Sequence, residues 1–140
     1  MKASMLVLTV AAASGCGTSE KAEQPVAAKP KTVSVAAATE DFKAAVDKFD
    51  TDGGCLEQAP GTCWSEMTAV MEPARTLRKA MNADKTVGPD FWTGAYALIN
   101  TMEKGIAVGE DKGAGTFSNR PDVLGSAHHL ADWLDEHPLS

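Results

Sequence analysis

The 140-residue chain lacks any apolar run long enough to cross a membrane. The most apolar run, residues 3–13 (ASMLVLTVAAA), falls well short of the ~20 residues that a membrane-spanning helix needs. The chain also lacks an excess of positive charge, with 13 Lys and Arg against 19 Asp and Glu and a net charge of −6. An acidic domain offers no electrostatic attraction to a phosphate backbone, so nucleic acid is not an expected partner.

The motifs of common catalytic and cofactor sites are also lacking. There is no Cys-x-x-Cys-His for covalent haem, and the glycines near residue 113 have neither a preceding strand nor a Gly-Lys-Ser/Thr. The run from Asp50 to Gly53 begins like a calcium loop, but no register supplies both the sixth-position glycine and the closing glutamate. No nucleophile–base pair or metal triad is readable, so the sequence predicts no catalytic residue, no cofactor and no enzyme.

The first sixteen residues have the composition of an export signal. Lys2 precedes the apolar run, and the small residues Ala13, Ser14 and Gly15 lie directly before Cys16. This resembles the lipobox of bacterial lipoproteins, over these sixteen residues only. The resemblance implies a signal peptide at residues 1–15, a diacylglycerol on Cys16, and a membrane-anchored protein of the cell envelope on the extracytoplasmic side. The alternative is an ordinary secretory signal cleaved after Ala13, with a soluble product.

The use of cysteine agrees with export. Once Cys16 carries lipid, Cys55 and Cys63 remain as an even pair in an oxidising compartment, which predicts a disulfide. A bridge over a loop of this length contributes on the order of 2–3 kcal/mol of stability. Residues 16–32 comprise the lipidated cysteine and a polar, Pro- and Ala-bearing segment that predicts a flexible tether. Residues 33–140 form the predicted domain.

No stretch of this domain alternates apolar and polar residues as a strand does, whereas apolar residues recur at helical spacing. We predict an all-α antiparallel bundle of about four helices, with the disulfide at the first turn between helices. Residues 110–117, rich in glycine and charge, are expected to be its loosest part. The predicted helices run from Val35 to before Gly53, from an N-cap at Thr62 to about Asn82 with a break or kink at Pro73, from Pro89 to Gly109, and from Ser118 or Asn119 to before Pro138.

A few residues are candidates for binding. His128 and Asp132, one turn apart on the last helix, are the candidate metal ligands, with His129 and His137 nearby. Met67 and Met71 suit copper or haem ligation, but their phase favours the core. The remaining candidates are a cationic Arg78 within an apolar face, and Trp64, Trp92 and Trp133 beside the apolar stripes.

For each of these residues, a packing or solvated role is the simpler interpretation. The sequence therefore predicts a non-enzymatic module that binds a protein or another envelope component, besides the membrane that holds its lipid. The alternative is a binder of a small ligand, a metal or haem.

Overall fold

The computed structural model describes residues 32–139 and confirms the all-α prediction. The predicted signal, Cys16 and all of the tether before Thr32 lie outside the described residues. A short 3₁₀ turn, η1, leads into the third helix, and a π-helical turn, η2, leads into the fourth. The elements are α1 (Val35–Thr51), α2 (Trp64–Ala83), η1 (Pro89–Trp92), α3 (Thr93–Ile106), η2 (Pro121–Gly125) and α4 (Ser126–Glu136).

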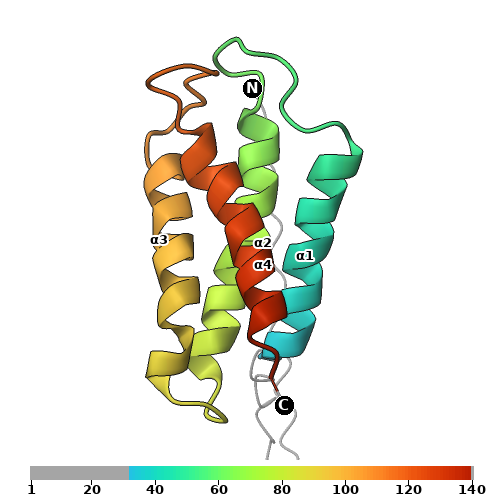
Figure 1. Ribbon diagram of the computed structural model, residues 1–140, viewed down its shortest axis with the longest axis vertical. Helices are drawn as coiled ribbons and strands as arrows, with labels where there is room; N and C mark the ends of the chain where they lie inside the picture. The colour runs from blue at the N-terminus through green and yellow to red at the C-terminus, as the bar shows by residue number, and fades with distance from the viewer. Residues whose placement is uncertain (1–31, 140) are drawn as a thin grey trace, which may run out of the picture. The chain divides into compact units, whose positions relative to one another are not determined.

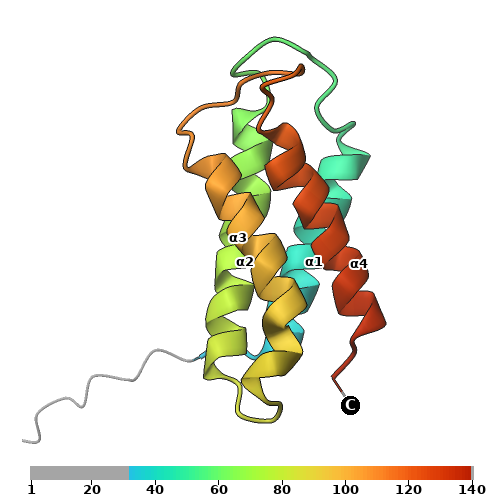
Figure 2. The ribbon, with the colours of Figure 1, turned by 60° about the vertical axis from the view of Figure 1, so that its left-hand side comes forward.

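The four helices alternate in direction and close into a ring (Figure 1). α1 packs against α2, α2 against α3, α3 against α4, and α4 against α1. The two long loops, residues 52–63 and 107–120, meet at one end, which we call the loop end. The start of α1, the α2–α3 connection and the end of α4 lie at the opposite end, here called the terminal end (Figures 1 and 2).

The apolar stripes of the helices meet inside this ring. The methionines considered as metal or haem ligands, Met67 and Met71, are buried among aliphatic side chains, as the packing interpretation predicted. Burying such a side chain contributes about 1.5–3 kcal/mol relative to leaving it exposed. Among the described residues, no helix combines the length and apolarity needed to cross a membrane.

Three local predictions need correction. Thr62 does not cap α2, because its hydroxyl donates to the carbonyl oxygen of Ala59 at 2.7 Å and Cys63 occupies the N-cap position. Of the two residues predicted to cap the last helical segment, Asn119 does not, since its side chain bonds to Gly105 in α3 and to Lys112 in the loop, whereas Oγ of Ser118 accepts from the N–H of Arg120 at 3.2 Å. Finally, α2 does not break into two helices at Pro73, since it continues from Trp64 to Ala83 with buried residues on both sides of the proline.

Two helical glycines show where the backbone needs space. A Cβ on Gly105 would lie 2.6 Å from the Cγ2 atom of buried Val123 and 3.2 Å from the carbonyl oxygen of Asn119. A Cβ on Gly125 would meet no atom within 4 Å. The missing side chain at Gly105 thus permits η2 to pack directly on the backbone of α3.

This contrast yields a matched prediction. We expect Gly105→Ala to destabilise the domain by about 1–3 kcal/mol, because the inserted methyl group overpacks a rigid contact. Gly125→Ala is expected to stabilise it by roughly 0.5–1 kcal/mol, because alanine is the better helix former. Urea denaturation of both variants measures the two effects. Equal effects of the same sign would contradict the packing described for α3 and η2.

Candidate functional site

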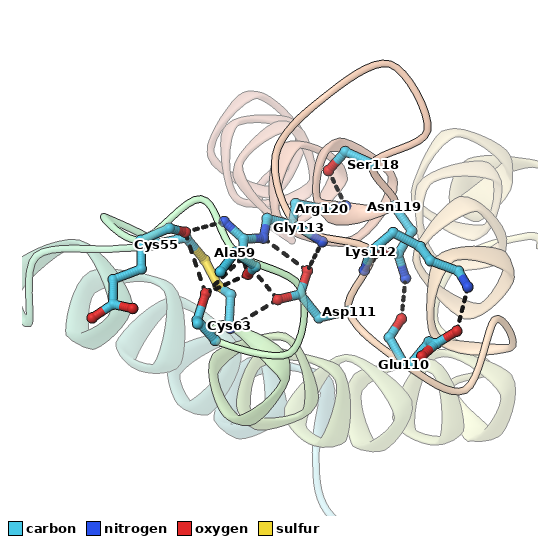
Figure 3. Close-up of polar contacts among 12 residues, drawn as sticks. Cys55, Ala59, Cys63, Glu110, Asp111, Lys112, Gly113, Ser118, Asn119 and Arg120 are labelled. Atoms are coloured by element: carbon cyan, nitrogen blue, oxygen red, sulfur yellow. Dashed lines mark hydrogen bonds and ion pairs between the residues drawn. A yellow bond between two sulfur atoms is a disulfide. The ribbon is translucent and has the colours of Figure 1, made fainter.

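A disulfide cross-links the first loop at the loop end. Cys55 and Cys63 lie eight residues apart in the first loop, with their Cα atoms separated by 5.6 Å (Figure 3). The predicted disulfide is therefore confirmed, at the predicted turn between α1 and α2. Cys63 is buried, so the bridge ties the loop to the core at the start of α2.

A buried ion pair also stabilises the loop end. Arg120 donates from Nε to Oδ1 of Asp111 and from Nη2 to Oδ2, both at 2.8 Å (Figure 3). Asp111 is only 1% exposed and Arg120 only 7%. Two parallel hydrogen bonds between charged groups form the strongest geometry available to this pair.

The guanidinium of Arg120 also joins the second loop to the first. Its Nη1 donates to the carbonyl oxygen of Glu57 at 2.6 Å. Its Nη2 donates to the carbonyl oxygen of Ala59 and to Oγ1 of Thr62, each at 2.9 Å. These carbonyls lie in an irregular loop and have no helical partner, and the arginine donates to them in addition to the hydroxyl of Thr62.

Backbone contacts strengthen the same junction. Gly61 donates to the carbonyl oxygen of Asp111, and Ala114 donates to that of Gln58, both at 2.9 Å. Gly113 has a φ of +74°, and a Cβ there would lie 2.6 Å from the carbonyl oxygen of Gln58. The two loops therefore approach at a distance that only glycine permits at this position.

The side chain of Asn119 forms hydrogen bonds that link the second loop to the end of α3. Its Nδ2 donates to the carbonyl oxygens of Gly105 and Glu110 at 2.9 and 2.8 Å, and its Oδ1 accepts from the backbone N–H of Lys112 at 2.9 Å. These bonds hold the first residues of the segment 110–117, although its glycine-rich, charged composition predicted the loosest part of the domain.

The environment keeps both members of the ion pair charged. Hydrogen bonds from Arg120 lower the pKa of Asp111 far below its usual range, against the opposing effect of burial. The N–H groups of Cys63 and Gly113, at 2.9 and 2.8 Å, act in the same direction. The hydrogen bond to Asp111 likewise raises the pKa of Arg120. A carboxyl with a depressed pKa stabilises the fold above its unfolded pKa, and the contribution is lost as pH falls toward the folded value.

An open hollow of about 430 Å³ lies beside this network, where the second loop meets η2 and α4. His128 forms part of its wall. The Nδ1 atom of His128 lies 2.8 Å from the carbonyl oxygen of Leu124, and Nε2 lies 2.9 Å from Oδ1 of Asp50 on α1. Both partners are acceptors, so both ring nitrogens must donate and the imidazole is protonated when the two contacts form.

The pKa of His128 follows this geometry. Partial burial lowers it, but the hydrogen bonds to Asp50 and to the carbonyl oxygen of Leu124 outweigh burial and raise it overall, with a further contribution from the charge of Asp132. The contact joins the last helix to the end of α1. The sequence predicted a metal ligand at His128 and did not identify Asp50 as its partner.

The other candidate metal ligands do not join His128 in a larger cluster. Asp132 and His129 are exposed, and Asp132 acts on His128 through its charge. His137 stacks on Trp133 with ring centroids 4.1 Å apart, at the terminal end. Within residues 32–139, no group of three or more His, Cys, Asp or Glu side chains is arranged to hold a metal ion.

Arg78 is held at the α2–α3 contact. Its Nη1 donates to Oδ1 of Asn100 at 2.6 Å, and its guanidinium lies 5.6 Å from the ring centroid of Tyr96. Arg75, three residues earlier, pairs with Glu103 of α3 through two hydrogen bonds of 2.9 and 2.8 Å.

Two of the tryptophans belong to an aromatic cluster at the terminal end. Trp92 is buried, and its ring lies 4.7 Å from that of Phe91 and 6.0 Å from that of Trp133. Trp64 is partly buried against the core. These side chains fill space between helices, as the packing interpretation predicted.

The loop end instead exposes its large apolar side chains. Leu56 in the first loop is 81% exposed and Phe117 in the second is 90% exposed. A rigid framework carrying exposed apolar groups next to a hollow is a geometry suited to binding a partner.

Comparison with known proteins finds no matching family model, no matching curated protein and no matching solved structure.

The ion pair gives a sharp stability prediction. Asp111→Asn should cost about 3–5 kcal/mol of unfolding free energy, because it leaves the buried charge of Arg120 without its counter-ion. Glu110→Gln is the control, since the neighbouring Glu110–Lys112 pair is exposed and should contribute less than about 1 kcal/mol. Chemical denaturation of both variants gives the comparison. A similar small cost for both would show that the pair does not hold the loops.

His128 gives a prediction on pH. A raised folded-state pKa means that the contact with Asp50 stabilises the domain below the unfolded pKa of histidine, and that this stability is lost as pH rises through the folded value. The stability difference between wild type and His128→Gln should therefore be larger at pH 5.5 than at pH 8.5. It should not exceed roughly 1 kcal/mol, because the pair is half exposed. The control is His129→Gln on the same helix, whose side chain is exposed, and it should cost less stability than His128→Gln at pH 5.5.

Proposed function

We propose that this protein is an extracytoplasmic lipoprotein, anchored through Cys16, whose bundle is a non-enzymatic binding module that contacts its partner with the loop end. Support for the anchor comes from residues 1–16, where a basic residue and a short apolar run precede small residues and a cysteine. The Cys55–Cys63 disulfide supports an oxidising compartment, since such bridges are rare in the reducing cytosol.

One observation carries the binding role: Leu56 and Phe117 are exposed on loops that a disulfide and a buried ion pair hold rigid. An exposed aromatic side chain contributes no burial energy to the stability of the monomer. Held in a fixed position, however, it loses little conformational entropy when a partner covers it. The disulfide and the ion pair therefore favour binding as well as folding, because they reduce the conformational entropy that the loops lose when a partner binds.

The arrangement of the ends fits an anchored module. The described chain enters α1 at the terminal end, and the loop end lies at the far end of the helices (Figure 2). At a rise of 1.5 Å per residue, the 17 residues of α1 span about 25 Å. Thr32, where the described chain begins, therefore lies at the opposite end of the bundle from Leu56 and Phe117.

Photo-cross-linking in native membranes tests this function. A photoreactive amino acid at Phe117 of the full-length chain should yield discrete adducts with a partner. The same amino acid at Leu139, an exposed apolar residue of the terminal end, is the matched control and should yield few or none. In the same fractionation, Cys16→Ser should release the chain from the membrane and abolish the incorporation of labelled palmitate.

Each part of the proposal can fail separately. Membrane retention and lipid labelling that persist in Cys16→Ser would overturn the anchor. Adducts formed equally from residues 117 and 139 would overturn the loop end as the binding face.

A further inference from the structure

A second hollow lies at the loop end, between the last turns of α1 and the first turns of α2. This α1–α2 hollow has a volume of about 380 Å³, within the range of pockets that hold small ligands. Gly54 of the first loop also lines it, and a Cβ there would lie 3.4 Å from the Cζ atom of Phe49. The apolar side chains of the wall are Ala45, Phe49, Ala69 and Val70.

One carboxylate in this wall has no partner. Within residues 32–139, the Oε2 atom of Glu66 is shielded from water and accepts no hydrogen bond. Glu66 lies in the first turn of α2, where the helix dipole favours negative charge. A carboxylate oxygen that loses its hydration without gaining a donor costs free energy, and a ligand that supplies the donor recovers it.

The nearby cations of the described chain do not supply this donor. Lys48, which also lines the hollow, pairs with Asp52, and both side chains are mostly exposed. The charge of Glu66 raises the pKa of Arg120, but the guanidinium of Arg120 donates to Asp111 and to the first loop. The wall therefore holds two carboxylates and one ammonium group, and its unbalanced charge is negative.

This combination favours an alkylammonium group as the ligand. An alkyl chain suits the apolar part of the wall, and a terminal ammonium group offers three donors to Glu66. The ring of Phe49 lines the same space, and an aromatic face attracts a cation. Lysine is the protein side chain that combines an alkyl chain with an ammonium group.

The α1–α2 hollow also lies beside an exposed apolar residue of the loop end. A Cβ on Gly53 would lie 3.6 Å from the Cδ1 atom of Leu56, and Gly54, the next residue, lines the hollow. Leu56 is itself largely exposed. A partner that covers Leu56 is therefore within reach of the hollow.

We propose that the α1–α2 hollow receives a lysine side chain of the partner protein. The ammonium group binds Glu66, and the alkyl chain packs against Phe49 and Ala69. The inference rests on the proposed binding function and deepens it, because it assigns the chemistry of a partner residue that the loop end recognises.

The test uses the full exported chain with its disulfide intact and three synthetic peptides. The peptides share the sequence Gly-Leu-X-Leu-Gly, in which X is lysine, norleucine or glutamate. Norleucine keeps the alkyl chain and lacks the ammonium group, so it isolates the effect of the charge. Binding is followed by the amide NMR shifts of residues 45–54 and 65–70. The lysine peptide should shift these amides in a saturable manner, the norleucine peptide should bind about fivefold to tenfold more weakly, and the glutamate peptide should bind least.

A charge variant locates the ammonium group. Glu66→Gln keeps the shape of the side chain and removes its charge, so it should weaken binding of the lysine peptide about fivefold to tenfold. It should leave binding of the norleucine peptide unchanged. Glu40→Gln makes the same change at an exposed residue of α1 that does not line the hollow, and it should bind both peptides as wild type does.

A second variant locates the alkyl chain. Ala69 lines the hollow and is exposed, so Ala69→Leu should fill the hollow without disturbing the core. It should abolish the shifts caused by the lysine and norleucine peptides alike. Ala97→Leu, at an exposed position of α3 outside the hollow, is its control and should retain them.

Several results would overturn the inference. Equal affinity for the lysine and norleucine peptides, a Glu66→Gln variant that still prefers lysine, an unaffected Ala69→Leu variant, or no shifts at all would each do so. Shifts of the same amides that grow with protein concentration alone would identify a second copy as the occupant instead of a partner. Binding of n-butylammonium as tight as that of the lysine peptide would identify a free amine, and the same shifts with phosphatidylethanolamine vesicles would identify a lipid headgroup. Specific cross-linking from residue 117 alongside any of these results would leave the proposed function standing and reject only the lysine site.

Discussion

The loop end depends on the buried bond between Asp111 and Arg120. Removing two charges from water is costly, and the pair is tolerated because its hydrogen-bonding groups find partners. The carboxylate accepts from the guanidinium and from two backbone N–H groups, while the guanidinium also reaches the first loop. The Asp111–Arg120 ion pair and its further hydrogen bonds thus hold together two loops that have little apolar surface in contact.

The helices and loops form a consistent unit around this bond. The loop that carries Asp111 begins after α3 and ends at Arg120, where η2 starts. Gly105 lets η2 approach α3 closely, and Asn119 bonds to the carbonyl oxygen of Gly105 at that same point. The N–H of Ser126 donates to the carbonyl oxygen of Pro121, the wider spacing of a π turn, and such turns occur often at functional sites. The hollow lies at this departure from regular helix.

The bundle was predictable because its information is periodic. On α1, for example, the buried residues Val35, Ala38, Phe42 and Val46 recur at spacings of three and four, and the disulfide followed from the count of cysteines. The hydrogen bonds and the ion pair that join the two loops were not predictable in this way. Asp111 and Arg120 are nine residues apart in a polar, glycine-rich stretch, and their partners lie some sixty residues earlier in the chain. Likewise, the pairing of His128 with Asp50 joins residues 78 apart, which no local pattern encodes.

Three large aromatic side chains at the terminal end contact one another, whereas two large apolar side chains at the loop end stay exposed, and this contrast supports the proposal that the loop end binds a partner. At the terminal end, Phe91, Trp92 and Trp133 contact one another, so their apolar surface is largely satisfied within the monomer. At the loop end, Leu56 and Phe117 remain exposed although the chain around them is firmly held. Flexible loops could turn such side chains inward, but the disulfide and the bond between Asp111 and Arg120 oppose that collapse. Because rigidity preserves the exposure, the same interactions that stabilise the loops also keep an apolar surface available to a second molecule.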